Sequence, residues 1–250
     1  MKRIFFFLFF LLPFLQNTAQ IKENERLTFA ASYNMSGLMT QLAQVTMETK
    51  TATTSRSAFL HLKIQASTFS QWDSYFRIRD VFESYVNPKT LVPSLYRRDV
   101  NEGGYTKIER YVYSADGRTV NATVSRKNAP EQTRSFTKKP SSVDIVAAIY
   151  QMRTVDFSQF KIGQTHPMDI VFDEKEFSAQ VKYMGKETIS IGKLGRVECY
   201  KLSLSAAGTD VLRGKDRNLV WITADERRIP VFIQFSIPVG TGQLMITEIK

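Results

Sequence analysis

The sequence has only one cysteine, Cys199, among its 250 residues. A single thiol excludes an intramolecular disulfide, so the chain is not a small disulfide-stapled fold. Cys199 lies in an alternating run, 196–202, that is typical of a strand, where a lone thiol is usually a small core residue. No sequence pattern supplies a basic partner that would lower its pKa and make it a nucleophile.

Histidine is almost as scarce, and the common catalytic patterns are missing. His61 and His166 are the two histidines, and neither belongs to a spacing that is typical of metal ligands. The sequence contains no Gly-x-Ser-x-Gly nucleophile elbow. We therefore predict no catalytic residue, no metal site and no cofactor. One enzyme class stays open, a glycan hydrolase with paired carboxylates, because such pairs have no fixed spacing.

Long apolar runs are limited to the first residues of the chain. Lys2 and Arg3 precede an apolar stretch, Ile4 to Leu15, which is followed by small and polar residues. This pattern predicts a secretory signal peptide over residues 1–20, cleaved after Ala19 or Gln20; an uncleaved anchor is the alternative. We expect an exported protein, soluble in the periplasm or outside the cell, with no transmembrane span after signal removal.

The chain is basic, with a formal net charge of +10 that falls by two when Lys2 and Arg3 leave. In an exported protein, this positive charge serves either solubility or binding to anionic lipid head groups or acidic glycans. We expect no nucleic-acid partner. The partners expected are therefore a lipid, a glycan or another envelope protein.

What the chain has in abundance is alternation. In the segment 58–66, Ala58, Leu60, Leu62 and Ile64 fall on one face, and polar residues fall on the other. Similar runs recur to the C-terminus and are separated by short turns rich in glycine, asparagine and aspartate. We predict an all-β fold: a single antiparallel meander over residues 21–250, closed or nearly closed into a β-barrel, because closure removes exposed edges.

One segment has helical spacing instead. Residues 142–154 combine a serine N-cap, an acidic residue in the first turn and an arginine near the end, so we predict one helix there. The stretch before it, 125–139, predicts a mobile loop that is either a solvated hairpin connection or, if it has a role, a segment attracted to anionic surfaces. The candidate contact residues are Arg126, Lys127, Arg134, Phe136, Lys138 and Lys139.

Several short motifs occur in a characteristic order. Asp80-x-x-Glu83-Ser84-Tyr85 is followed by Asn87-Pro88, then by Glu102-Gly103-Gly104-Tyr105, and later by Trp221-Ile222-Thr223-Ala224-Asp225 before Arg228-Ile229-Pro230. This order resembles an exported bacterial family, the domain of unknown function number 3108, whose members look like β-barrels of the YmcC-like type. The resemblance implies a barrel and brings no activity or functional residues. The last hairpin is also similar to a tract in periplasmic lipoprotein carriers, which concerns fold rather than function.

Two small groups of polar and aromatic residues are candidate ligand-binding sites. Asp80 falls on an apolar strand face, so it either anchors a ligand inside the barrel or bonds a turn amide or Arg98. Trp221, Asp225 and Arg228 form the second group. In one interpretation Trp221 stacks on a ligand and the two charged residues gate the mouth of the barrel. In the other, Trp221 is a core residue and the charged residues belong to a solvated turn.

Three functions compete at this stage. The first is a non-catalytic binding or assembly module, with an apolar or glycan ligand in the barrel interior or mouth. The second is a structural interaction domain whose barrel is filled by its own side chains. The third is the glycan hydrolase. An apolar cavity would support the first, a packed interior the second, and two carboxylates facing each other across a cleft the third.

Overall fold

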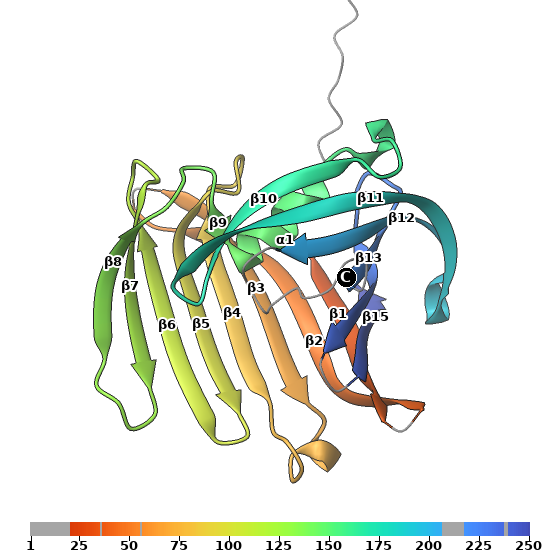
Figure 1. Cartoon of the computed structure of the whole chain (residues 1–250), viewed down its shortest axis with the longest axis horizontal. Helices are drawn as coiled ribbons and strands as arrows, with labels where there is room; N and C mark the ends of the chain where they lie inside the picture. Colours follow the sequence, from red (N-terminus) through yellow and green to blue (C-terminus); the bar gives the residue numbers. More distant parts are fainter. Residues whose placement is uncertain (1–20, 36, 56, 207–217, 238–239) are drawn as a thin grey trace, which may run out of the picture.

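The computed structural model describes residues 21–35, 37–55, 57–206, 218–237 and 240–250. The expected signal peptide, residues 1–20, lies outside this part. Within the described part the strands form one sheet of fifteen, in the order β8-β7-β6-β5-β4-β3-β2-β1-β15-β14-β13-β12-β11-β10-β9. The sheet curls around a single α-helix, α1 (Figure 1). The predicted all-β, nearly closed architecture is therefore confirmed.

The elements follow the turn signals of the sequence closely. Every strand pair is antiparallel except β9 with β10, which is parallel at Ile170 and Val171. The strands are β1 Arg26–Met35, β2 Leu38–Thr53, β3 Ala58–Thr68, β4 Arg79–Val86, β5 Pro93–Glu102, β6 Tyr105–Tyr113, β7 Thr119–Arg126, β8 Gln132–Thr137, β9 Val143–Asp144, β10 Thr165–Phe172, β11 Lys175–Ile191, β12 Gly195–Ala206, β13 Asn218–Thr223, β14 Pro230–Ile237 and β15 Gly240–Ile249. The helix is α1 Ile145–Thr154, and 3-10 turns lie at Ser70–Trp72, Phe157–Gln159 and Gly192–Leu194.

Alternation places one face of each strand inside the curl. On β3, Leu60 and Leu62 are buried, and Ile64 packs against the main core. The first and last strands are neighbours, since β1 pairs with β15 from Leu27 opposite Ile249 to Tyr33 opposite Gly242. The meander is thus joined through its two ends.

The two edges of the sheet, β8 and β9, are not joined by backbone hydrogen bonds. The short segment 138–142 connects them, and side chains bridge the remaining gap. The backbone N–H of Lys139 donates to Glu176 Oε1 at 2.9 Å, and its ammonium lies 2.8 Å from Asp169. Ser142 Oγ also bonds Glu176. The barrel is therefore nearly closed, with side-chain contacts at the seam.

Helix α1 begins later than predicted. Val143 and Asp144 are extended because they pair with β10, so the helix starts at Ile145 and Asp144 is its N-cap. The Asp144 carboxylate accepts a hydrogen bond from the Ala147 N–H at 2.9 Å. The prediction of a serine N-cap near Ser142 is wrong, although the position of the helix in the chain is right.

The predicted mobile loop at 125–139 is also wrong. Residues up to Arg126 belong to β7, and 132–137 form β8, which pairs with β7 from Val124 opposite Gln132 to Thr119 opposite Thr137. The segment is therefore an ordered hairpin, in agreement with the interpretation as a hairpin connection. Its high polarity reflects its place at the edge of the sheet, where much of each side chain is exposed.

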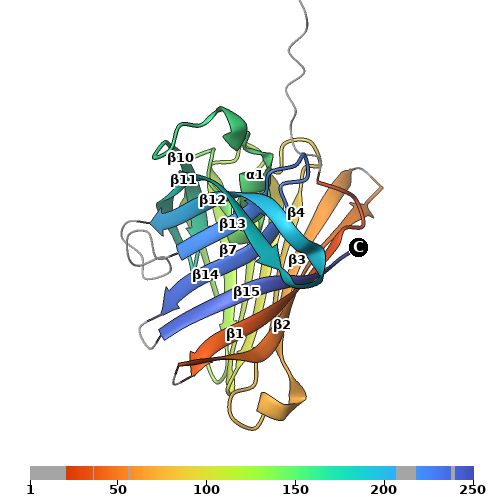
Figure 2. The same ribbon diagram turned by 90° about the vertical axis from the view of Figure 1, so that its right-hand side faces the viewer.

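The β11–β12 hairpin is longer than its neighbours and bends over the outer face of the sheet (Figure 2). The bend occurs at Gly185, whose φ of +109° accompanies a shift of the strand register after Tyr183. Cys199 lies on β12 within this extension, opposite Glu187, and is fully buried. Burial raises the pKa of the Cys199 thiol to about 11, so it behaves as a core residue.

Candidate functional site

The barrel interior contains an apolar cavity of about 260 Å³. Its wall comes from α1 and from strands of both halves of the sheet. Every lining residue is apolar: Phe29, Val45, Met47, Ile64, Ile145, Ala148, Ile149, Met152, Met168, Ile170, Phe177, Ala179, Val181, Leu204, Val220, Pro230, Ile233 and Leu244. The cavity thus offers no side-chain hydrogen-bond partner to a ligand.

Helix α1 forms one wall of this cavity through a regular stripe. Ile145, Ala148, Ile149 and Met152 recur at spacings of three and four, which is one face of a helix. Ala148 is small, so the cavity extends toward the helix at this point. The helical spacing that predicts α1 therefore also predicts which of its residues face the interior.

The other half of the interior contains a polar cluster beside buried core residues such as Tyr96, Val120 and Ala122. The inner face of β6 presents Lys107, Glu109 and Tyr111, all of them buried. Glu109 is fully buried and receives three partners: Arg98 at 3.0 Å, Lys107 at 2.8 Å and the Tyr111 hydroxyl at 3.1 Å. Two cations around one carboxylate leave a local excess of positive charge.

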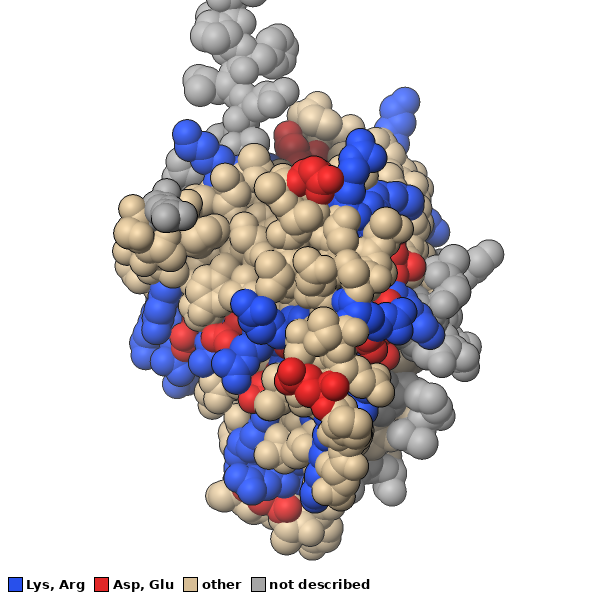
Figure 3. All heavy atoms as spheres, turned by 90° about the vertical axis from the view of Figure 1, so that its left-hand side faces the viewer, with Lys and Arg blue, Asp and Glu red and all other residues tan. Residues whose placement is uncertain are grey.

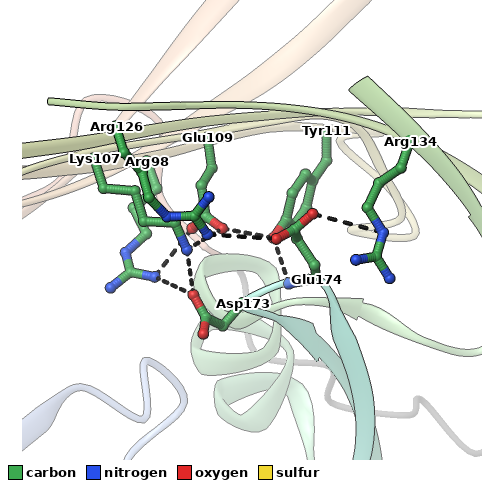
Figure 4. A network of polar contacts seen from close by, with 8 residues as sticks. All are labelled: Arg98, Lys107, Glu109, Tyr111, Arg126, Arg134, Asp173 and Glu174. Atoms are coloured by element: carbon green, nitrogen blue, oxygen red, sulfur yellow. Dashed lines mark hydrogen bonds and ion pairs between the residues drawn. The ribbon is translucent and has the colours of Figure 1, made fainter. Parts of the chain in front are cut away.

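The turn between β10 and β11 supplies the missing negative charge (Figure 4). Asp173 contacts Lys107 and lies 3.4 Å from Arg98. The backbone N–H of Glu174 donates to the Tyr111 hydroxyl at 2.8 Å. Burial raises the pKa of Asp173, but the hydrogen bond and charge of Lys107 outweigh it, so the net pKa is lowered. The ionised turn is held across the concave face of β5 and β6.

The same turn also holds the edge of the sheet. The Glu174 carboxylate lies 3.7 Å from Arg126 on β7 and 3.6 Å from Arg134 on β8. Asp173 and Glu174 adopt φ values of +52° and +60°, which suit a tight two-residue hairpin turn. The network therefore connects four strands of one half of the sheet to a turn from the other half.

Arg98 marks the border between the two halves of the interior. Its guanidinium lies 4.5 Å from the centre of the Phe172 ring and 5.5 Å from that of Phe82. These rings pack against the apolar core, while the guanidinium bonds Glu109. A cation between aromatic faces is favourably placed, so Arg98 ties the charged network to the apolar core.

Asp80 is buried on β4. Its carboxylate accepts a hydrogen bond from the Asn101 N–H at 2.9 Å and is hydrogen-bonded to Glu102. Burial and the hydrogen bond with Asp80 raise the pKa of Glu102 to about 6. The two carboxyls are in direct contact, whereas the acid pairs of glycoside hydrolases are about 5–10 Å apart.

Trp221 does not face the cavity. Its neighbour Val220 lines the cavity, so Trp221 points to the outer face of β13, where the β11–β12 extension covers it. The indole N–H donates to Glu187 Oε2 at 3.0 Å, and the Lys201 ammonium lies 5.0 Å from the ring centre. Trp221 is thus held by protein side chains of that extension.

Asp225 and Arg228 lie in the β13–β14 turn. Asp225 accepts hydrogen bonds from the Thr223 hydroxyl at 2.5 Å and from the Arg227 N–H at 3.1 Å. Arg228 lies 3.4 Å from Asp156, beyond the end of α1. The five candidate residues are therefore dispersed over four places and do not form a common site.

The candidate anionic-surface residues are also divided. Arg126 and Arg134 face Glu174, Lys139 faces Asp169, and the Lys138 ammonium is buried, donating to the Ser142 carbonyl at 2.7 Å. The remaining two are Phe136, whose ring lies edge-on to Tyr111, and Lys127, which is exposed. On this side of the molecule basic and acidic side chains are interspersed (Figure 3).

Asp144 is a buried group that sequence reasoning did not single out. Its carboxylate is fully buried beneath α1 and accepts hydrogen bonds from Ala147 and from the Ser84 hydroxyl at 2.7 Å. Burial dominates and raises its pKa to about 6. An acidic residue at the start of a predicted helix was the available signal, but its burial depends on β4, sixty residues earlier.

Asp144→Asn should change how stability depends on pH. The pKa of Asp144 is higher in the folded protein than the unfolded value of about 3.9, so the protonated carboxyl stabilises the fold below about pH 4. This stabilisation, about 3 kcal/mol in total, is lost as the pH rises through about 6. Asparagine keeps the helix cap without this titration. Urea unfolding at pH 4 and pH 8 should show the wild type losing this amount relative to the variant. A difference between them that is independent of pH would contradict the assignment.

Among the described residues, no group of three or more histidine, cysteine, aspartate or glutamate side chains could hold a metal ion. Nor does any helix there have the length and apolar character to cross a membrane.

Comparison with known proteins agrees with the fold. Residues 28–247 match the family described as "Protein of unknown function (DUF3108)". A crystal structure of a beta-barrel-like protein of the domain of unknown function DUF1849 from Brucella abortus superposes with a TM-score of 0.57. The two chains are 8% identical, and the match covers 91% of this chain and 97% of the other. No curated protein matches the sequence.

Proposed function

We propose that this chain, which belongs to the DUF3108 family of proteins of unknown function, binds one apolar ligand in the barrel cavity. Membership of the family brings no activity, so the proposal rests on the interior of the barrel. The finer proposal is a binding module for a hydrocarbon group, such as part of an acyl chain or an apolar ring. The proposed setting is the cell envelope. This setting rests on the signal-peptide pattern of residues 1–20, which lie outside the described part of the structure.

The chemistry of the cavity wall carries this proposal. An apolar cavity of roughly 150 Å³ stays dry and binds benzene, and the cavity here is larger, at about 260 Å³. A sugar hydroxyl placed in it would lose its hydrogen bonds to water and gain none from these side chains, at a cost of about 1–3 kcal/mol each. The wall therefore favours a hydrocarbon over a glycan.

The lining also allows adjustment and access. Met47, Met152 and Met168 contribute flexible thioether side chains, which adapt to the shape of a ligand. Val45 and Ile64 are only partly buried although they line the cavity. Solvent therefore reaches part of the inner surface, which supports entry of a ligand from outside.

Ala148→Leu tests the proposal by filling the cavity from the helix side. The full-length protein should bind the fluorescent probe N-phenyl-1-naphthylamine, and the added side-chain volume should weaken that affinity about tenfold or more, because probe and leucine compete for the same space. Ala179→Leu fills the opposite wall and serves if the first variant unfolds. Fluorescence titration gives the affinities, and urea unfolding confirms that each variant is folded.

Ala58→Leu is the matched control, since it makes the same change at an exposed position at the start of β3. It should leave probe affinity within about twofold of the wild type. Equal weakening by Ala58→Leu, or no probe binding by the wild type, would contradict ligand binding in the cavity. The second result would favour the structural role, in which part of the interior is already filled by the network around Glu109.

A further inference from the structure

A second hollow, a polar cleft, adjoins the apolar cavity. The cleft has a volume of about 1310 Å³, and its wall comes from α1, β10, the β4–β5 turn and the segment that precedes β1. Most of its lining residues are polar or charged, whereas every residue that lines the cavity is apolar. Lys89 and Thr90 are exposed at its border, so the cleft is open to solvent. The two hollows therefore suit different chemical groups.

The cleft and the cavity meet along α1. Ala148 and Met152 line the cavity, and Gln151 and Val155 line the cleft. At 3.6 residues per turn, these two pairs fall on adjoining faces of the helix. Met168 of β10 lines both hollows, and its side chain is only partly buried. The flexible thioether of Met168 therefore lies between the two spaces.

Two polar side chains lie near this point, one on each wall of the cleft. His166 precedes Met168 by two residues, so both fall on the same face of β10. Burial lowers the pKa of His166, so its ring is neutral at about pH 7 and has one donor and one acceptor. Gln151 donates one amide N–H to the Leu91 carbonyl at 3.4 Å. Its second N–H and its carbonyl oxygen can bond a ligand.

The charged side chains of the cleft balance each other. The lining contains two lysines and two acidic residues: Lys22, Lys89, Glu23 and Asp169. Just outside the lining, the Lys139 ammonium lies 2.8 Å from Asp169, and the Lys139 N–H donates to Glu176. The lining and these neighbours thus carry equal numbers of charges of each sign. Such a cleft attracts neither an anion nor a cation by net charge, and it favours an uncharged group that forms hydrogen bonds.

We propose that the ligand is an amphiphile, with its hydrocarbon tail in the apolar cavity and an uncharged, hydroxyl-bearing head group in the polar cleft. This inference rests on the proposed function, because it extends the same site past Met168. In the cleft, head-group hydroxyls keep hydrogen bonds with protein groups or water, whereas in the cavity they would lose them. A glycerol ester of one fatty acid is the simplest ligand of this class.

The test is displacement of N-phenyl-1-naphthylamine from the full-length protein by 1-monodecanoylglycerol, decanoate and decyltrimethylammonium, all kept below micelle formation. The uncharged ester should displace the probe at about a tenfold lower concentration than either ion. Gln151→Leu with His166→Leu removes the polar groups beside Met168, so it should weaken affinity for the ester about tenfold. The same variant should keep its probe affinity within about twofold, because the cavity wall is unchanged.

The matched control is Gln132→Leu with His61→Leu, which makes the same two changes at positions that line neither hollow. It should leave both affinities within about twofold of the wild type. Urea unfolding checks each variant, and Gln151→Leu alone, which leaves β10 unchanged, serves if the double variant unfolds.

The outcomes separate this inference from the proposed function. If the wild type does not bind the probe, both are overturned. If the probe binds but either ion displaces it as well as the ester does, the assignment of the head group is overturned and cavity binding stands. The same holds if the cleft variant keeps its affinity for the ester, or if the control variant loses that affinity equally.

Discussion

Arg153→Met should lower the free energy of unfolding by about 3–5 kcal/mol, because it leaves the Glu25 carboxylate buried without its partner. The Arg153 guanidinium, fully buried on α1, makes two bonds to Glu25, at 2.7 and 2.9 Å, and a third to the Arg227 carbonyl at 3.2 Å. The pair anchors the helix to the segment that precedes β1. Equilibrium urea unfolding measures the loss.

Arg26→Met provides the surface comparison. Arg26 pairs with Glu48 at 3.4 Å and is half exposed, so its removal should cost less than about 1 kcal/mol. The double variant Glu25→Leu with Arg153→Met should be less destabilised than the sum of its single variants, since no lone charge remains buried. If Arg153→Met cost no more than Arg26→Met, the buried pair would not have the role assigned to it.

Glu109→Gln should destabilise the protein by a similar amount, about 3–5 kcal/mol, and loosen the β10–β11 hairpin. Without this carboxylate, Arg98 and Lys107 share the single charge of Asp173. Hydrogen exchange should therefore speed up in residues 170–177 more than in β1 and β2. Urea unfolding and exchange measured by mass spectrometry give the two readouts.

Glu198→Gln is the control for this prediction. Glu198 pairs with Lys186 at 3.0 Å on the surface, and the same substitution there should change stability by less than about 1 kcal/mol. If hydrogen exchange in the β10–β11 hairpin of Glu109→Gln stays at the wild-type rate, other contacts hold the hairpin.

The sequence predicts the strands and the helix well because each depends on local periodicity. The alternation of β3 and the helical spacing of α1 are visible within ten residues, and the structure places both as expected. The prediction fails where one local pattern has two meanings. Segment 125–139 is polar because it is an edge hairpin whose cations face acidic residues of β10 and of the β10–β11 turn.

The interior network could not be predicted for a related reason. Lys107 and Glu109 share a strand face with Tyr111, and this polar face suggests solvent until the partner is known. That partner, Asp173, lies 66 residues further along the chain. Likewise, the cavity is defined by residues from α1 and many strands, and its volume depends on how they pack rather than on any one segment.

The pairing of β1 with β15 has a consequence for how the chain is made. The outer edge of β1 must wait for the last ten residues, since Leu27 meets Ile249 and the Arg26 N–H donates to the Lys250 carbonyl at 3.0 Å. This central seam can therefore form only after residues 240–250 have left the ribosome or a translocation channel. Contacts of such sequence separation make folding slow and leave an unpaired edge exposed meanwhile. A circular permutant that links Lys250 to Ile21 through a short linker and opens a distant turn keeps Glu25 and would bring the two seam strands together early, and we expect it to fold faster.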